Sequence, residues 1–197
     1  YPEEKFHHLI VEACKDKQSD QDIYELVQSQ LSEIKPFLAD LRYGLPALKK
    51  QKQEMTRQTL ELLEGQKSID GYIEIGAPAR YISDLRKSVK VTGNIVIIHD
   101  YAPDYSIPSM LERGQIRKLG QYLPLDYQPI DSTVVSDASI DLVSCMIGLH
   151  HCPIEDLDAF IRSIHRVLRK GGRFVLRDHD AGTPQMATFC SLVHTVF

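Results

Sequence analysis

The sequence of 197 residues has no long apolar run, no closely paired cysteines and no excess of positive charge. No apolar stretch approaches the length of a membrane span, and no signal-peptide pattern is present, so neither feature predicts a membrane or secreted protein. Four cysteines without CxxC spacing indicate reduced thiols and a cytoplasmic location. The formal net charge of -4 gives no general basic surface, so nucleic-acid binding would need a local basic patch.

The composition that is present is ordinary for a globular protein, with 43% hydrophobic and 25% charged residues. The length suits one α/β domain with an appendage. The chain begins at Tyr1 rather than at a methionine, and it stops at Phe197 inside an apolar stretch without a helix stop signal. We therefore expect it to be a fragment of a longer protein.

Residues 1–66 have the apolar spacing of helices and no strand-like alternation. Helices are expected over about 2–15, 21–34 and 46–63, the last ending at Gly65. The third helix carries four basic residues that could meet a polyanionic substrate, although a solvated face is the simpler reading. They are Lys49, Lys50, Lys52 and Arg57. We expect residues 1–66 to form a helical cap over the domain that follows.

From Gly71 onward, the pattern changes to strand, loop and helix, repeated along the chain. Strands are expected at residues 72–75, 94–98, within 120–127, 140–147 and 173–177. Helices are expected at residues 81–90, 109–118 and 155–169, with Pro103 and Pro108 before the second and a stop at Gly171 and Gly172 after the third. This alternation predicts a doubly wound, mostly parallel sheet.

The first of these strands leads into a loop that has the features of a nucleotide site. Glu74 stands near the strand's end, and Gly76 follows two residues later. Such a loop lets a nucleotide-like ligand lie over the carboxyl end of the strand. Such a loop usually repeats its glycine, but Pro78 and Arg80 occupy the next two alternate positions here. The loop alone is therefore a weak signal.

Four segments in order resemble the class I methyltransferases that depend on S-adenosylmethionine: GYIEIGAPAR, NIVIIHD, SIDLVSCMIGLHHCP and FIRSIHRVLRKGGRFVLRDHD. The resemblance covers about residues 71–180. It implies a Rossmann-like domain over residues 67–197, with the cofactor over the carboxyl ends of the first strands. That family's sheet normally has two further strands, which are expected beyond Phe197.

The resemblance also implies a set of cofactor contacts. Asp100 matches the acid that accepts hydrogen bonds from the ribose hydroxyls, and either Asp126 or Asp131 matches the acid at the adenine amine. Each position has a structural alternative, because Glu74 could be tied to nearby backbone N–H groups and Asp100 could cap a turn. The full set of expected contacts is Glu74, Gly76, Ala77, Pro78, Asp100, Tyr101, Asp126 and Met146.

Three histidines are candidates for a general base, since imidazole titrates near neutral pH. His150 and His151 follow the fourth expected strand, and His179 follows the fifth. The two adjacent histidines could instead cap the next helix. A metal site with Cys152 is not expected, because adjacent histidines on a turn point in different directions and no second cluster has standard ligand spacing.

We therefore expect an S-adenosylmethionine-dependent methyltransferase, acting on a nucleophile that is a small molecule by default. Nucleic-acid or protein acceptors stay open, as does the oligomeric state. One alternative is a catalytically inactive methyltransferase-like binding or regulatory module, which the missing glycines suggest. Another is a nicotinamide-dependent oxidoreductase, against which the missing glycine and the LHHCP turn both count.

Overall fold

The computed structural model describes residues 2–36, 39–146 and 148–196. These residues form two compact units, one made of Ala47–Asp178 and the other of Tyr1–Pro46 together with His179–Phe197. The third long helix, α3 (Leu45–Leu62), groups almost entirely with the first of these units. The two units are defined by contacts between residues, which do not by themselves define domains. The domain boundary expected near residue 66 therefore stays a prediction.

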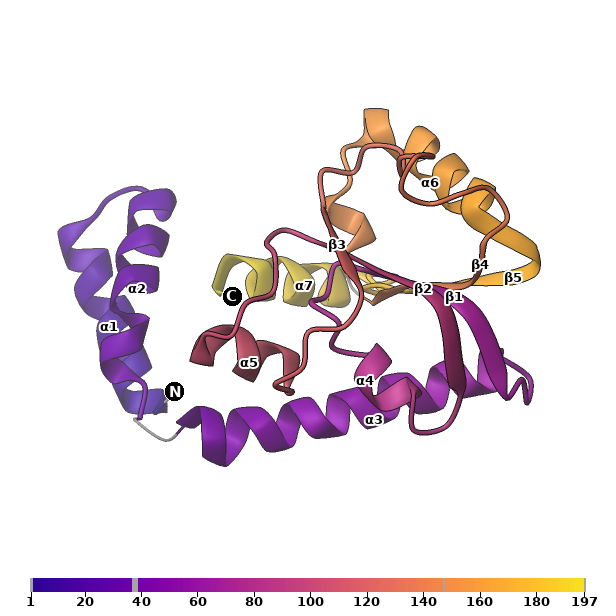
Figure 1. Ribbon diagram of the computed structural model, residues 1–197. Helices are drawn as coiled ribbons and strands as arrows, with labels where there is room; N and C mark the ends of the chain where they lie inside the picture. Colours follow the sequence, from indigo (N-terminus) through magenta and orange to yellow (C-terminus); the bar gives the residue numbers. More distant parts are fainter. Residues whose placement is uncertain (1, 37–38, 147, 197) are drawn as a thin grey trace. The chain divides into compact units, whose positions relative to one another are not determined.

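The larger unit is built on a five-stranded sheet in the order β3-β2-β1-β4-β5 (Figure 1). All four strand pairings are parallel. The strands are β1 (Ser68–Ile75), β2 (Lys90–His99), β3 (Gln121–Pro124), β4 (Ile140–Met146) and β5 (Leu168–Arg177). Each expected strand is confirmed, except that Ile147 of the fourth lies outside the described residues. The Rossmann-like parallel architecture is confirmed as well.

Helices cover both faces of this sheet, which explains why its strands are apolar on both sides. On one face, Tyr72 of β1 packs in a cluster with Met55 of α3 and Ile82 of α4 (Ile82–Leu85). On the other face, Ile73 of β1 packs with Phe160 of α6 (Ile154–Val167). Figure 1 shows α6 on the side of the sheet opposite to α3 and α4. The carboxyl edge of the sheet is thus held by a double-sided core.

Two of the expected helices are shorter than the sequence predicted. The helix expected at residues 81–90 is only the four-residue α4, because β2 begins at Lys90 and pairs there with Ser68. The helix expected at residues 109–118 is α5 (Ile107–Arg113), which starts earlier and ends at Gly114 with φ +61°. Proline fits a first helical turn, so Pro108 lies inside α5 rather than before it.

The glycines after α6 do not stop that helix, which corrects a second expectation. α6 ends at Val167, and β5 has already begun at Leu168. Pairing with β4 shifts register before Arg173, and Gly171 lies in this interruption with φ +85°. A Cβ on Gly172 would lie 2.9 Å from the carbonyl oxygen of Arg169. The two glycines therefore permit an irregularity inside the strand.

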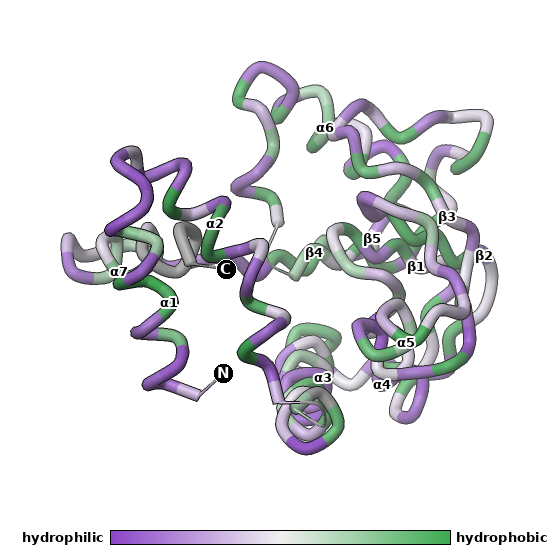
Figure 2. The backbone as a smooth tube through the Cα atoms, turned by 90° about the vertical axis from the view of Figure 1, so that its left-hand side faces the viewer, coloured by the Kyte–Doolittle hydropathy of each residue, from purple (hydrophilic) through white to green (hydrophobic). Residues whose placement is uncertain are grey.

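The smaller unit contains α1 (Glu3–Asp16) and α2 (Asp20–Ile34), both as predicted, with a π-helical turn at Asp40–Gly44 and α7 (Pro184–Val196). Leu9, Ala13 and Val27 form the buried centre between α1 and α2. Hydrophobic and hydrophilic stretches alternate along both helices (Figure 2), as amphipathic helices require. Within the described residues, no helix combines the length and apolar character of a membrane span.

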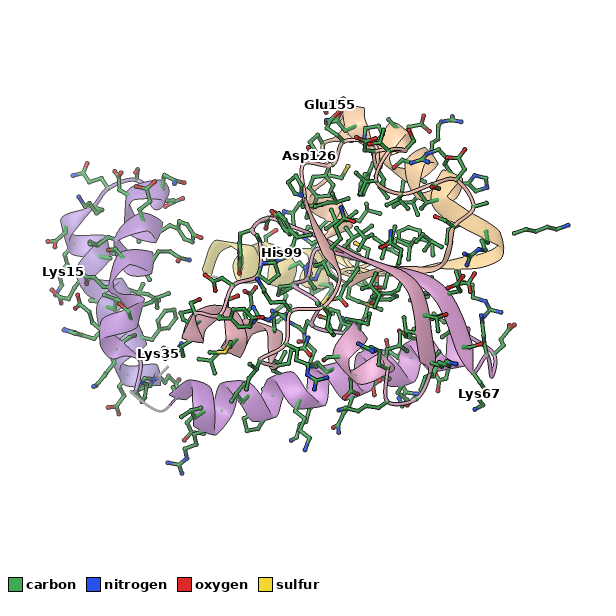
Figure 3. All side chains as sticks on the ribbon, in the orientation of Figure 1. Lys15, Lys35, Lys67, His99, Asp126 and Glu155 are labelled. Carbon is green, nitrogen blue, oxygen red and sulfur yellow. The ribbon has the colours of Figure 1, made fainter. Side chains whose placement is uncertain are left out.

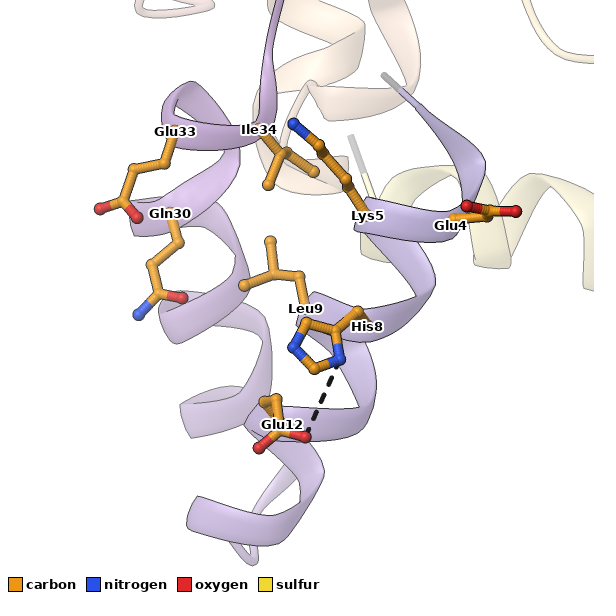
Figure 4. Close-up of a pocket in the computed structure, with 8 residues that line it drawn as sticks. All are labelled: Glu4, Lys5, His8, Leu9, Glu12, Gln30, Glu33 and Ile34. Atoms are coloured by element: carbon orange, nitrogen blue, oxygen red, sulfur yellow. Dashed lines mark ion pairs between the residues drawn. The ribbon is translucent and has the colours of Figure 1, made fainter.

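A groove of about 500 Å³ lies between α1 and α2 (Figure 4). Most of the residues that line it are of charged or polar types, and His8 Nδ1 lies 4.0 Å from a carboxylate oxygen of Glu12. A hydrogen bond from Lys15 lowers the pKa of Glu12, so this carboxylate is charged at neutral pH. The lining residues are Glu4, Lys5, His8, Leu9, Glu12, Gln30, Glu33 and Ile34.

Candidate functional site

The loops that follow β1, β3 and β4 meet at the carboxyl edge of the sheet. A Cβ on Gly148, after β4, would lie 3.9 Å from the Cα of Gly76, after β1. The hydroxyl of Tyr127, after β3, donates a 2.6 Å hydrogen bond to the carbonyl oxygen of Gly148. Carboxyl ends of parallel strands are where α/β proteins bind their ligands, so this meeting point is the candidate site.

Glu74 lies beneath this site and has no exposed surface. Its carboxylate accepts the backbone N–H groups of Tyr81 at 3.2 Å and Ile82 at 2.9 Å. The hydroxyl of Tyr72 donates to it at 3.0 Å. Burial raises the pKa of Glu74, and the three hydrogen bonds act against this shift. Glu74 therefore orients the loop and the start of α4, which is the alternative that the sequence left open. Its direct contact with a ligand stays a prediction.

The loop from Gly76 to Ala79 is compact without further glycines. Gly76 takes φ +75°, and its N–H donates to the carbonyl oxygen of Ile98 at 2.9 Å. Ala77, Pro78 and Ala79 are buried, and Ala79 itself takes φ +61°. An alanine in this region is strained, and such strain concentrates at functional sites. The loop thus makes a sharp, buried turn at the carboxyl end of β1.

Arg80, where a further glycine was expected, is held by α5. Its Nε donates to the carbonyl oxygen of Glu112 at 3.0 Å, and its Nη2 lies 3.6 Å from the carboxylate of Glu112. The hydroxyl of Tyr101 also donates to this carboxylate. The pKa of Tyr101 rises to about 12, through burial first and then through Glu112. Arg80 and Tyr101 thus join the β1 loop, the end of β2 and α5 around one carboxylate.

The expected acids lie on the loops after β2 and β3. Asp100 directly follows β2 and is exposed. Asp126 and Asp131 each close a local turn, to the N–H of Gln128 at 3.0 Å and of Thr133 at 2.7 Å. Both also line one hollow of about 230 Å³ beside β3, so the structure does not choose between them. Figure 3 labels Asp126 above the end of the sheet.

Tyr127 lies near charged or ionisable groups from the ends of several strands. Its pKa rises to about 12, chiefly because of burial and then because of four nearby groups. These groups are Cys145, Asp100, Cys152 and Asp178. They come from the end of β2, from β4 and its following loop, and from the end of β5. Asp100 and Asp178 therefore act electrostatically on the same region. Met146, at the end of β4, is 5% exposed and belongs to the core below it.

The candidate histidine His150 has a carboxylate partner, Asp178. Its Nδ1 lies 2.6 Å from Oδ1 of Asp178, and its backbone N–H donates to Oδ2 of the same carboxylate at 3.2 Å. The ring of His151 lies 4.1 Å from that of His150. His179 follows Asp178 in the chain and belongs to the other compact unit.

Comparison with known proteins decides the family. The sequence matches the family described as a methyltransferase domain over residues 78–176, which is half of the chain. The chain belongs to the class I S-adenosylmethionine-dependent methyltransferase family. The resemblance inferred from the four motifs is thereby confirmed, and S-adenosylmethionine is the cofactor of this family.

Several solved structures match this chain at low sequence identity. The YcgJ protein of Bacillus subtilis matches with a TM-score of 0.51 and 20% identity, over 72% of this chain and 58% of that one. A Burkholderia thailandensis 1,6-didemethyltoxoflavin-N1-methyltransferase matches with a TM-score of 0.45 and 17% identity, over 64% and 51%. An S-adenosylmethionine-dependent methyltransferase of Mesorhizobium loti gives 0.42 and 20%, over 60% and 50%.

The chain thus spans 58% of the length of the Bacillus subtilis protein. A search of curated protein sequences found no significant match.

Proposed function

We propose that this methyltransferase domain binds S-adenosylmethionine at the carboxyl edge of its sheet and transfers the methyl group to a nucleophilic acceptor. The observation that supports this most is the meeting of three loops at Gly76, Tyr127 and Gly148, beside the exposed Asp100. The cofactor supplies a methyl group on a sulfonium that is already a good leaving group. The protein then has to align donor and acceptor and exclude water.

Within this proposal, each cofactor contact has a place on the edge. The turn formed by Gly76, Ala77 and Pro78 would face the methionine part, and Asp100 would accept hydrogen bonds from the ribose hydroxyls. Tyr101 would flank the ribose from the same loop. Asp126 or Asp131 would meet the adenine amine. Glu74 would act through the loop that it holds, and Met146 would form the floor below the transferred methyl group.

A small-molecule acceptor is proposed, because two of the four basic residues of α3, Lys52 and Arg57, are engaged within the protein. Arg57 bonds to the carboxylates of Glu54 and Glu61. The amine of Lys52 is buried and donates to the carbonyl oxygen of Arg113 at 3.2 Å. Both arrangements favour a structural role over a polyanion-binding surface. We also propose a cytoplasmic location, on the cysteine spacing alone.

Calorimetry with S-adenosylmethionine and S-adenosylhomocysteine tests the binding half of the proposal. We expect both to bind the 197-residue chain. No heat of binding for either at millimolar concentration would remove the proposal. The transfer half is tested with methyl-labelled cofactor and a broad set of acceptors. Binding without transfer to any acceptor would favour the alternative of an inactive regulatory module, which the non-glycine residues of the loop motivate.

A further inference from the structure

One carboxylate holds His150 at two points. Asp178 accepts the ring Nδ1–H at 2.6 Å through Oδ1 and the backbone N–H at 3.2 Å through Oδ2. An ionised carboxylate can only accept hydrogen bonds, so the proton of a neutral His150 ring lies on Nδ1. Nε2 is then the ring nitrogen that carries the lone pair. Asp178 thus fixes both the position and the tautomer of the imidazole.

The loop that carries His150 is also fixed from its other end. Tyr127 donates its hydroxyl hydrogen bond to Gly148, two residues before His150. The side chains of His150 and Asp178 are 26% and 21% exposed, so the pair is partly screened from water but open to a ligand. The ring of His151 lies beside that of His150, and Cys152 follows it. A pre-oriented imidazole at the ligand edge of the sheet has the geometry of a general base.

We propose that His150 is the general base, that Asp178 is its positioning residue, and that the acceptor is a small molecule with a hydroxyl group. This rests on the proposed methyl transfer. A neutral amine has a nucleophilic lone pair, and a thiol is partly ionised near neutral pH, so neither depends on a strong base. A hydroxyl is a weak nucleophile until a base takes its proton. A histidine oriented by a carboxylate is therefore best explained by a hydroxyl acceptor.

The proposed step moves one proton to His150 and one methyl group to the acceptor oxygen. Nε2 of His150 takes the hydroxyl proton while the oxygen's electron pair forms a bond to the methyl carbon. The bond between that carbon and the sulfonium sulfur breaks, and its electron pair stays on the sulfur. The Asp178 carboxylate stabilises the resulting imidazolium through Nδ1–H. The imidazolium then returns its proton to water.

Nitrogen NMR of histidine side chains tests the orientation without any acceptor. We expect His150 to be the Nδ1–H tautomer in the unmodified chain. In Asp178→Asn, the backbone N–H of His150 can use only the amide oxygen, which leaves the amide NH₂ facing Nδ1. The ring should then switch to the Nε2–H tautomer. The control Asp158→Asn changes an exposed carboxylate on α6 and should leave the His150 signals unchanged.

Transfer from methyl-labelled S-adenosylmethionine to a panel of phenols, alcohols, thiols and amines tests the base and the acceptor class. We expect hydroxyl compounds to be methylated. His150→Gln and Asp178→Asn should each lower kcat by about 10²- to 10⁴-fold while cofactor affinity is unchanged. The acidic limb of the pH dependence of kcat, which reports protonation of the base, should be lost in His150→Gln. His165→Gln, on the exposed side of α6, is the matched control.

Three results would overturn the inference. The first is an Nε2–H tautomer of His150 in the unmodified chain. The second is unchanged kcat in His150→Gln. The third is cofactor binding with no transfer to any hydroxyl compound of the panel, which would leave the binding half of the proposed function intact. Absence of cofactor binding would instead overturn the proposed function itself.

Discussion

The hydroxyl of Tyr127 donates a hydrogen bond to the carbonyl oxygen of Gly148 over 2.6 Å, which joins the loops after β3 and β4. Gly148 is buried, and Tyr127 takes the left-handed backbone conformation with φ +56°. The Tyr127 ring also packs edge-on against Phe160 of α6 at a centroid distance of 5.6 Å. This tyrosine therefore fixes the loop that carries the proposed base.

Tyr127→Phe should destabilise the fold without disturbing the ring contact with Phe160. The buried carbonyl of Gly148 would lose its donor, which costs about 1–3 kcal/mol of unfolding free energy. Urea denaturation measures this loss. Tyr105→Phe, at a side chain that is 63% exposed, should change the unfolding free energy by less than about 0.5 kcal/mol. Equal stability of Tyr127→Phe and the unmodified protein would show that the hydroxyl of Tyr127 does not stabilise the fold through Gly148.

Asp100→Ala should weaken S-adenosylmethionine binding and leave the fold intact. The exposed carboxylate after β2 is proposed to accept hydrogen bonds from both ribose hydroxyls. Hydrogen bonds to a charged group contribute about 1.5–3 kcal/mol, so the Kd should rise by about 10- to 100-fold. Calorimetry measures the Kd, and circular dichroism checks the fold.

Asp104→Asn is the matched control for this prediction. Asp104 lies four residues further along the same loop, and its Oδ1 accepts hydrogen bonds from the N–H and the hydroxyl of Ser106. Asparagine keeps this oxygen, so cofactor affinity should stay unchanged. If Asp104→Asn weakens binding and Asp100→Ala does not, the ribose contact belongs to Asp104 and the assignment of Asp100 is wrong.

The sequence predicted the strands well because most of them lie in the centre of the sheet. Residues 94–98 are a β-branched run apart from Asn94, and both faces of a central strand are buried, so composition alone marks β2. Helix lengths were harder to predict. The extent of α4 depends on where β2 begins to pair with β1, and that pairing at Lys90 is a tertiary event. The role of Gly171 and Gly172 was predicted wrongly, because glycine is favoured both at helix ends and at irregularities within strands.

The candidate site was predicted only residue by residue. His150 was identified as a candidate base, but its pairing with Asp178 depends on the register of β4 with β5. That register places Met146 opposite Arg177, so the residues after each strand meet. The partner of Arg80 is Glu112, 32 positions away on α5, and no local pattern reveals it. Predicting contacts between loops requires the order of the strands in the sheet, and the sequence pattern did not reveal that order.

Glu74→Gln should alter how stability depends on pH. Burial raises the pKa of Glu74 above 4.5, so the folded state holds this proton at a higher pH than the unfolded state does. Between the unfolded and the raised folded pKa, the contribution of Glu74 to unfolding free energy therefore falls as pH rises. Gln does not titrate. The stability of the unmodified protein minus that of the variant should decrease above about pH 4.5.

Urea denaturation from pH 4 to 8 measures this difference. At every pH, Glu74→Gln should also be less stable, because an amide NH₂ would face the N–H of Tyr81 or Ile82. Glu61→Gln is the control, since that side chain is 65% exposed. A stability difference that does not vary with pH would show that the pKa of Glu74 is not raised in the folded state.

Arg169→Ala should destabilise the sheet at the edge opposite to the site. The guanidinium bonds to Asp141 at 2.8 Å and to the carboxylate of Asp70 at 2.9 Å, beside the register shifts of β1 with β2 and of β4 with β5. Because Arg169 is 35% exposed, we expect a loss of about 1 kcal/mol rather than the larger value of a buried pair.

Arg162→Ala is the control, because it removes a helical ion pair that is 77% exposed and should cost at most about 0.5 kcal/mol. Urea denaturation ranks the two variants, and an equal loss in both would show that Arg169 does not hold these strands in register. Cofactor affinity should be unchanged in Arg169→Ala, because the contacts of Arg169 lie at the amino ends of the strands.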